Sequence, residues 1–348
     1  MRAIRFGDYN TRRPQVFGEH SAASIARSSG KWRDIPYLRE NDGMLPPSVM
    51  VVGDRRRVLA AAELLHEGIL LHEEVASRVG PGGSGRVNVA IGIYEHKGRP
   101  LPLTILETQM GMSPQDIIVW EALVNSREDG YMVNGLATPG DCLNVIRAGT
   151  CGGIILAEGG VQEEGPFIEI GDSIIAFSSL AAGTVAMQRM GYWSPFDPKE
   201  IAGFRADWAK EGLGFTKDGL WPIALSSFDV VNALVLACKE FGLTYHQGNN
   251  FSKDSLYMEG NEERLKDLRT RYGVLSTEME HFGLAFIAHE LTRAGIPTRT
   301  GLISTVVGTV PGGSFAAPGS EEEKRADRNT KTMLEATMHA LWKLAYGS

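Results

Sequence analysis

The sequence SVMVVGDRRRVLAAAELL, residues 48–65, places a short apolar run, a glycine turn and an alanine- and leucine-rich segment in direct succession. The run at 48–52 is typical of a buried strand, and the segment at 58–65 is typical of a helix. Residues 103–125 repeat this cycle: a strand at 103–106, a turn at 109–112, and a helix at 114–125 with Ser113 as its N-cap. Strands that alternate with helices in this way favour a parallel sheet covered on both faces.

The rest of the chain continues the pattern. A third strand at 143–146 ends at Arg147 and is followed by a glycine-rich turn at 149–153. We expect further strands at 243–247 and 301–304, and further helices at 229–241, 278–294 and 333–344. The predicted fold is α/β: a single three-layer α/β/α domain with a central mixed, largely parallel sheet. We divide the chain into an N-terminal extension, 1–45, and a main domain, 46–348, and assign no role to an insertion at 191–221.

Composition excludes several classes of protein. The chain has 348 residues, of which 43% are hydrophobic and 22% charged, as in a globular protein rather than a disordered one. Its net charge of −7 argues against nucleic acid as a partner. Apolar runs are shorter than the roughly 20 residues that cross a membrane, so no membrane partner is expected.

Cysteine content and the N-terminal segment bear on location. The three cysteines suit neither a disulfide framework nor a zinc site, so we expect a reducing, cytoplasmic location. Residues 1–33 carry seven Lys or Arg against two acidic residues, which fits a solvated arm or a transit peptide.

One motif is misleading. The glycines at positions 80, 82 and 85 match the GxGxxG dinucleotide fingerprint by letter. That loop must follow a strand and open a helix, whereas these glycines precede residues 86–91, which alternate like a strand. We therefore interpret the segment as a connection and expect no nucleotide cofactor.

Two groups of arginines suggest a bound anion. Arg55, Arg56 and Arg57 lie at the amino end of a predicted helix, where they either extend into solvent or help the helix dipole to hold an anion. Arg147 ends a buried strand before a turn with exposed amide groups and the Thr150 hydroxyl. It either pairs with an acidic residue distant in sequence or, with the first group, forms a phosphate pocket at the carboxyl edge of the sheet.

The third constellation is Glu278-Met279-Glu280. Thr277 and Glu280 have the spacing of a helix-capping box. The helix that follows is apolar over much of its circumference, so the two carboxylates are expected at a buried helix mouth. Buried carboxylates require hydrogen-bond donors, which the hydroxyl groups of a sugar diol supply. A metal site with His281 is disfavoured because adjacent helical residues point in different directions, and we predict no metal.

These motifs together resemble the nucleoside phosphorylases of the uridine phosphorylase and hexameric purine nucleoside phosphorylase type, with uridine phosphorylase the nearer of the two. Their order along the chain carries the resemblance, which spans roughly residues 34–344. The matching segments are Gly53-Asp54-x-x-Arg57-Val58, Thr108-x-Met110-Gly111, Arg147-Ala148-Gly149-Thr150-Cys151-Gly152, Ser252-Lys253-Asp254-Ser255-Leu256-Tyr257 and Glu278-Met279-Glu280.

The resemblance implies a pentosyltransferase that uses inorganic phosphate as co-substrate and needs no cofactor. Phosphate would attack the anomeric carbon of a nucleoside and release ribose 1-phosphate and the free base. Arg147, Glu280 and Arg57 would carry the catalysis. The residues implied for phosphate are Gly53, Arg57, Arg147, Gly149, Thr150 and, from a neighbouring subunit, Arg86, with Arg78 as second choice. The residues implied for ribose are Tyr37, Met279 and Glu280, and those for the base are Cys151, Gly152, Leu256, Asn261 and Arg264.

The chain departs from the family pattern at three places. Tyr37 stands where a histidine near the ribose 5′-hydroxyl is usual, and Ser304-Thr305 stands where the purine branch has Ser-Asp. Asn261 and Arg264 are spaced one residue wider than the Gln and Arg that grip uracil in the uridine branch. The missing Asp favours uridine over a purine nucleoside.

Other functions stay open at this stage. They are a purine nucleoside phosphorylase, a hydrolytic nucleosidase that uses water in place of phosphate, and a non-catalytic nucleoside-binding module. The two arginine groups argue against a hydrolase, which needs no phosphate cage. Sites shared between subunits imply a homo-oligomer: a dimer, or a hexamer assembled from dimers.

Overall fold

The computed structural model describes residues 46, 48–70, 88–115, 118–119, 132–133, 136–137, 142–155, 157–158, 161–162, 167–182, 213–217, 221–254, 262–293, 297–310 and 315–347. The predicted arm, the glycines at 80–85 and most of the 191–221 insertion lie outside these residues.

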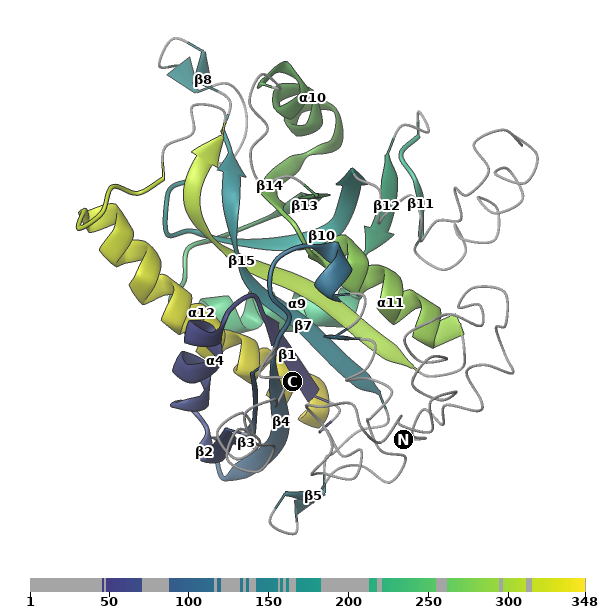
Figure 1. Ribbon diagram of the computed structural model, residues 1–348, viewed down its shortest axis with the longest axis vertical. Helices are drawn as coiled ribbons and strands as arrows, with labels where there is room; N and C mark the ends of the chain where they lie inside the picture. Colours follow the sequence, from purple (N-terminus) through teal and green to yellow (C-terminus); the bar gives the residue numbers. More distant parts are fainter. Residues whose placement is uncertain are drawn as a thin grey trace, which may run out of the picture.

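Strands predominate among the described elements up to residue 225, and helices and strands alternate from residue 228 onward (Figure 1). In order they are β1 (Ser48–Val52), α4 (Arg55–Ala62), β2 (His66–Leu70), β3 (Val89–His96), β4 (Arg99–Glu107), β5 (Met132–Val133), β6 (Leu136–Ala137), β7 (Leu143–Ile154), β8 (Ala157–Glu158), β9 (Val161–Gln162), β10 (Ser173–Ala182), β11 (Leu213–Phe215), β12 (Pro222–Leu225), α9 (Phe228–Glu240), β13 (Tyr245–Lys253), α10 (Glu262–Tyr272), β14 (Val274–Glu278), α11 (His281–Arg293), β15 (Thr298–Val310) and α12 (Glu321–Tyr346).

One large mixed sheet organises the molecule. Its strands run in the order β11-β12-β10-β13-β14-β7-β1-β4-β3-β2, and β15 pairs with both β10 and β7. The strands β7, β14, β13, β10 and β15 therefore close into a circuit of hydrogen-bonded neighbours. The α/β class and the mixed sheet agree with the sequence prediction.

Two details of the predicted fold need correction. The described sheet has five parallel and six antiparallel strand pairs, so "largely parallel" overstates its parallel character. A three-layer arrangement also does not describe the closed circuit. The physical reason is β15, which is long enough to bridge β7 and β10 along its length.

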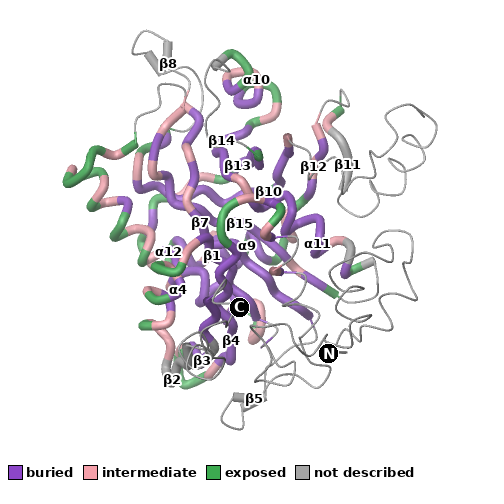
Figure 2. The backbone as a smooth tube through the Cα atoms, viewed as in Figure 1, coloured by how far each residue is buried: buried purple, intermediate pink, exposed green. Residues whose placement is uncertain are grey.

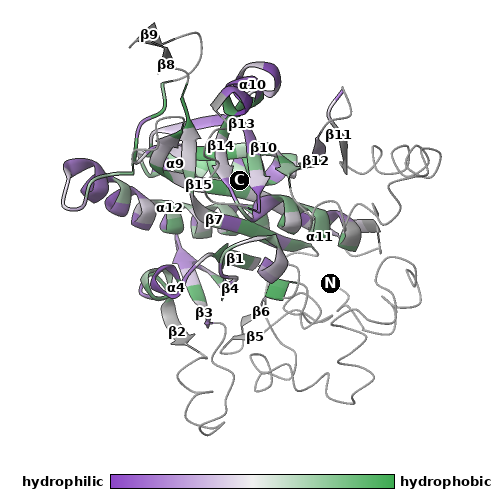
Figure 3. Ribbon diagram, turned by 45° about the horizontal axis from the view of Figure 1, so that its top comes forward, coloured by the Kyte–Doolittle hydropathy of each residue, from purple (hydrophilic) through white to green (hydrophobic). Residues whose placement is uncertain are grey.

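Helices cover this sheet from outside. α12 and α9 pack against each other and against β15, and α4 packs beside them against β3 and β4. Residues Met50, Ile146, Leu234 and Leu341, all fully buried, belong to the core cluster between these helices and the strands. α11 packs on β15 and β10, and α10 packs on β14. The buried strands occupy the centre of the molecule (Figure 2), and the polar residues of α12 and α10 lie outermost (Figure 3).

Helix ends follow local chemistry. Asp54 is extended (φ −151°) and accepts a hydrogen bond from the Arg57 amide at 3.1 Å, so it caps α4. Ser320 caps α12 in the same way, and Glu321, Glu322 and Glu323 in its first turn suit the helix dipole. In the described part of the chain, no helix combines the length and the apolar character needed to cross a bilayer.

Candidate active site

A cavity of about 390 Å³ opens where β1, β13 and β14 end and where β7 and β15 pass beside them. Carboxyl ends of parallel strands are the usual ligand-binding edge of such sheets. The residues that line the cavity are Gly53, Asp54, Arg57, Gln109, Met110, Arg147, Thr150, Cys151, Gly152, Lys253, Thr277, Glu278, Met279, Glu280, Val307, Gly308, Thr309, Val310 and Phe315.

Two guanidinium groups meet at one end of the cavity. A Cβ atom on Gly53 would lie 3.1 Å from Arg147 Nη2 and 3.6 Å from Arg57 Nη1, so the absence of a side chain at Gly53 makes room for both arginines. Arg57 Nη2 also donates to Thr150 Oγ1 at 3.4 Å. Burial and the Arg147 charge lower the pKa of Arg57. Two cations held this close in a buried place indicate a site for an anion.

Several donors of these two arginines have no acceptor among the described residues. Arg57 Nη1, Arg147 Nε and Arg147 Nη1 are buried and make no hydrogen bond there. An unsatisfied buried donor costs about 1–3 kcal/mol, and more when it is charged. A tetrahedral oxyanion such as phosphate, with several acceptor oxygens, would satisfy these donors together.

A buried ion pair joins this end of the cavity to its middle. Arg147 Nη2 lies 2.8 Å from Glu280 Oε2, and both side chains are about 95% buried or more. The Gly111 amide donates to Glu280 Oε1 at 2.9 Å. Burial alone would raise the pKa of Glu280, but Arg147 and the Gly111 amide outweigh it and lower this pKa, so the carboxylate is ionised. Glu280 thus presents a fixed negative charge beside the two cations.

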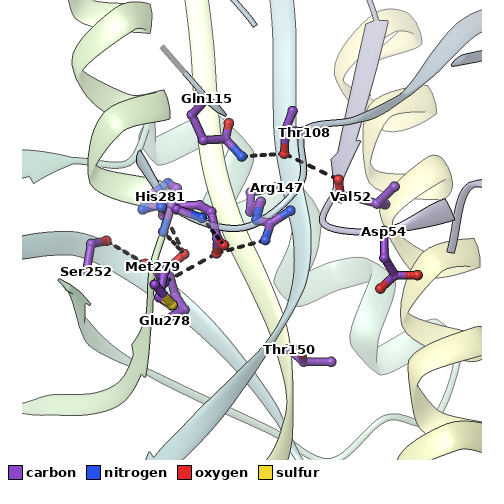
Figure 4. Close-up of polar contacts among 12 residues, drawn as sticks. Val52, Asp54, Thr108, Gln115, Arg147, Thr150, Ser252, Glu278, Met279 and His281 are labelled. Carbon is purple, nitrogen blue, oxygen red and sulfur yellow. Dashed lines mark hydrogen bonds and ion pairs between the residues drawn. The ribbon is translucent and has the colours of Figure 1, made fainter. Parts of the chain in front are cut away.

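Glu278 fixes the backbone on which Glu280 stands. Its Oε2 accepts hydrogen bonds from the Glu280 and His281 amides at 2.8 and 2.9 Å, and its Oε1 accepts from Asn250 Nδ2 at 2.7 Å and from the Ser252 hydroxyl. Burial and the Glu280 charge raise the pKa of Glu278 to about 7. Figure 4 shows Glu278 between Ser252 and the start of α11.

A second layer of polar contacts lies behind Glu278. Asn250 Nδ2 also donates to Ser179 Oγ at 2.9 Å, and Ser179 Oγ lies 2.7 Å from His281 Nδ1. Complete burial, followed by the Arg147 charge, lowers the pKa of His281 to about 3, so its ring is neutral at pH 7. This layer ties β10, β13 and β14 to the first residue of α11.

Part of the cavity lining is apolar. Val307, Val310 and Phe315 belong to this part, from the end of β15 and the residues after it. Lys253, the last residue of β13, lines the same space and is only 6% exposed. Burial lowers its pKa, although the Glu278 charge opposes this effect.

Eight of the residues assigned from the sequence to phosphate, ribose or base line the cavity. They are Gly53, Arg57, Arg147, Thr150, Cys151, Gly152, Met279 and Glu280. Gly149 lies beneath Arg147 instead, where a Cβ atom would be 3.4 Å from Arg147 Nε.

The other predicted site residues lie elsewhere or cannot be placed. Arg264 is exposed on α10 and sits over the Trp221 ring at 4.9 Å, so it is not part of the cavity lining. The predicted positions at Tyr37, Arg78, Arg86, Leu256 and Asn261 lie outside the described residues.

Two local predictions are wrong. The glycine-rich segment 149–153 is not a turn, because β7 continues through it and pairs with β15, so it forms no amide nest. Thr277 is not a helix cap, because it lies in β14, and the Glu278 carboxylate caps α11. Ser304 and Thr305, which depart from the purine pattern, lie within β15 and are not among the lining residues of the cavity.

The sequence reasoning also missed some residues of the site. Asn250 and Lys253 received no role, although both are polar residues in or at the end of a strand whose Phe251 and Ser252 are buried. A polar amide and a lysine in a buried strand require partners, and this is the signal that could have found them. Among the described residues, no three His, Cys, Asp or Glu side chains gather as a metal-binding group.

Comparisons with known proteins agree with this geometry. The model of the phosphorylase superfamily matches residues 49–341. A DeoD-type purine nucleoside phosphorylase from Shewanella denitrificans is 23% identical over 74% of this chain and 80% of its own length. A DeoD-type purine nucleoside phosphorylase from Pasteurella multocida is 40% identical over a shorter segment, 19% of this chain and 27% of its own length.

Solved structures share the fold. The purine nucleoside phosphorylase of Toxoplasma gondii superposes with a TM-score of 0.57 at 18% identity, over 90% of this chain and 96% of that one. The uridine phosphorylase of Vibrio fischeri superposes with a TM-score of 0.58 at 17% identity, over 87% of this chain and 93% of that one. The family resemblance seen in the sequence is therefore confirmed, and the chain belongs to the phosphorylase superfamily, whose homologous members are pentosyltransferases.

Proposed function

We propose that this protein is a nucleoside phosphorylase, which uses phosphate to cleave the N-glycosidic bond of a nucleoside to ribose 1-phosphate and free base. The observation that carries the proposal is the pair of buried guanidinium groups, Arg57 and Arg147, whose unsatisfied donors lie beside the ionised Glu280. A hydrolase that activates water has no use for such an arrangement of donors.

The arrangement suits the chemistry of phosphorolysis. Arg147 uses Nη2 for Glu280, which leaves Nε and Nη1 for phosphate oxygens. Glu280 in turn accepts hydrogen bonds from the two secondary hydroxyls of ribose. One residue pair thereby orients nucleophile and sugar, and holding two reactants in attack geometry supplies a large part of such a rate enhancement.

The negative charges in the site also suit the transition state of this reaction. As the glycosidic bond breaks, the sugar acquires oxocarbenium character and therefore positive charge. The phosphate anion and the Glu280 carboxylate both lie near that charge, and fixed charges in a water-poor cavity act more strongly than in bulk water. Met279 contributes apolar contact with the ribose.

Two bases remain candidates. The sequence favours uracil as the base. The predicted contact of Arg264 with uracil is not supported, because the Arg264 side chain lies over the Trp221 ring. A purine base is favoured by the curated relatives described above, which are named purine nucleoside phosphorylases. Uridine and inosine therefore enter the test as equal candidates.

The test is base release from uridine, thymidine, inosine, adenosine and cytidine, each with and without phosphate. The proposal expects release only when phosphate is present, with ribose 1-phosphate or its deoxy counterpart as second product. Equal release without phosphate would identify a hydrolytic nucleosidase. Binding of nucleoside without release would identify a binding module.

A further inference from the structure

Lys253 lines the cavity but has no part in the proposed phosphate and ribose contacts. Lys253 follows Ser252, which pairs with Glu278 across β13 and β14. β13 is the second strand away from β7. Neighbouring strands lie about 4.8 Å apart, so the end of β13 is on the order of 10 Å from the strand that carries Arg147 and Thr150. A nucleoside whose C1′ faces the phosphate would extend its base over a comparable distance.

The departing base needs help that the lining carboxylates do not give. When the C1′–N bond breaks, its electron pair stays on the base, which leaves as an anion unless it is stabilised or protonated. The carboxylates that line the cavity are Asp54, Glu278 and Glu280. Asp54 pairs with Arg57 at 2.7 Å, Glu280 pairs with Arg147, and Glu278 accepts four hydrogen bonds. All three are thus already engaged with groups of the protein itself.

Resting on the proposed function, we infer that the Lys253 ammonium donates a hydrogen bond to a carbonyl oxygen of the nucleobase and stabilises the anion that leaves. In this step a phosphate oxygen forms the bond to C1′, and the C1′–N electron pair passes into the base. Its negative charge is delocalised onto the carbonyl oxygen that faces Lys253. The ammonium keeps its proton, and the base takes a proton from water after release.

The inference names the class of substrate. An ammonium group donates hydrogen bonds and accepts none, so it cannot pair with an exocyclic amino group. Bases that turn a carbonyl oxygen toward Lys253, such as uracil or hypoxanthine, are favoured over adenine. Lys253 is only 6% exposed, and a charge acts over a longer range where water is excluded, which strengthens the interaction.

The experiment compares ordinary and activated substrates in matched pairs. Uridine is paired with 5-fluorouridine, and inosine with 7-methylinosine, whose bases leave more readily. Lys253→Met removes the charge at similar length, and Lys253→Arg keeps it. Lys239→Met, an exposed lysine on α9, is the control and should match the wild type.

Lys253→Met should lower kcat/KM for the ordinary substrate by about 10²–10³-fold, the usual cost of one lost charge-stabilising donor. The activated partner should lose at least about tenfold less, and Lys253→Arg should recover part of the rate. The rise in melting temperature that inorganic phosphate gives should be the same in Lys253→Met as in the wild type, since the arginine end is untouched.

The outcomes separate the two proposals. Equal losses for both members of a pair, or no loss at all, would overturn the role of Lys253 while leaving phosphorolysis in place. A lost phosphate response in Lys253→Met would mean that the lysine supports the phosphate end instead. A wild-type protein that releases no base with phosphate would overturn the proposed function, and the inference with it.

Discussion

Arg57 shows how position changes the role of one residue type. It is the third of three consecutive arginines, and Arg55 and Arg56 are exposed, whereas Arg57 turns inward to Asp54 and Thr150. Helical geometry makes the difference, because successive side chains point about 100° apart. The sequence alone could not separate solvent-exposed arginines from one that lines a cavity. In the structure Arg55 and Arg56 are exposed, and Arg57 lines the cavity.

This contrast gives a prediction with a built-in control. Arg57→Met should lower phosphate-dependent kcat/KM by about 10²–10³-fold, as removal of a charge-stabilising donor usually does. Arg55→Met, two residues away on the same helix, should stay within a factor of about two, since exposed charges contribute little. The measurement is steady-state base release at several phosphate concentrations. Similar losses in both variants would mean that the helix end, not the inward guanidinium, matters.

Glu278 is a second residue whose role follows from its hydrogen bonds. Above pH 7, where this carboxyl is ionised, its two oxygens each accept from two donors, so no position remains for an N–H group. Glu278→Gln, although nearly isosteric, would turn an amide NH₂ toward one pair of these donors. We expect a loss of about 2 kcal/mol or more in the free energy of unfolding, because a buried donor is left unsatisfied.

Chemical denaturation of Glu278→Gln measures this loss directly. Glu263→Gln, an exposed glutamate on α10, provides the matched control and should be neutral. A Glu278→Gln variant as stable as the control would show that Asn250 and Ser252 re-orient to satisfy the amide.

Among the elements, β15 carries the part of the fold that the sequence did not indicate. The apolar stretch 301–304 predicts a short strand, but β15 runs from Thr298 to Val310. Threonine, valine and glycine continue the strand because β7 beside it offers a full partner. Strand length is decided by such long-range pairing, which a local pattern does not contain.

The pairing of β7 with β15 also explains why the predicted turn at 149–153, just after Arg147, is wrong. Five residues rich in glycine after an arginine are typical of a turn, yet here they lie between β15 and β14, where small residues allow close approach. Eight of the residues that the family motifs implied nevertheless line one cavity, because the motifs specify side chains rather than backbone. By contrast, the sequence could not identify Glu280 as the ion-pair partner of Arg147, since the two residues lie far apart in the chain.

The contact between β15 and α9 is close enough to test. A Cβ atom on Gly301 would lie 2.5 Å from Val230 Cγ1. Gly301→Ala should therefore destabilise the protein by about 1–3 kcal/mol through overpacking. The double variant with Val230→Ala should recover part of this loss, as measured by denaturant unfolding. Additive losses would show that the strain of Gly301→Ala lies elsewhere.

At the scale of the whole molecule, the predicted sharing of active sites between subunits is open to a complementation experiment. Arg86, from a neighbouring subunit, and Arg147, from the same subunit, are proposed to hold one phosphate. Arg86→Ala and Arg147→Met should each be inactive alone. Refolded together as a mixture, they should regain activity in about a quarter of the sites, because mixed dimers of symmetric subunits hold one intact pair.

The readout is base release by the mixture against each variant refolded by itself. An inactive mixture that nevertheless assembles would place Arg86 in its own subunit's site or outside any site. Size-exclusion chromatography of the mixture distinguishes that result from failed assembly.

The closed circuit of strands also determines when the chain can fold. One edge of β7 pairs with β14 and β15, which come much later in the chain. Leu143, for example, pairs with Thr298. During synthesis, this edge of β7 has no strand partner until β14 and β15 have left the ribosome. Such edges invite association with other chains, and distant pairings slow folding. The geometry that holds Arg147 against Glu280 is thus completed only after an interval in which the nascent chain presents an open strand edge.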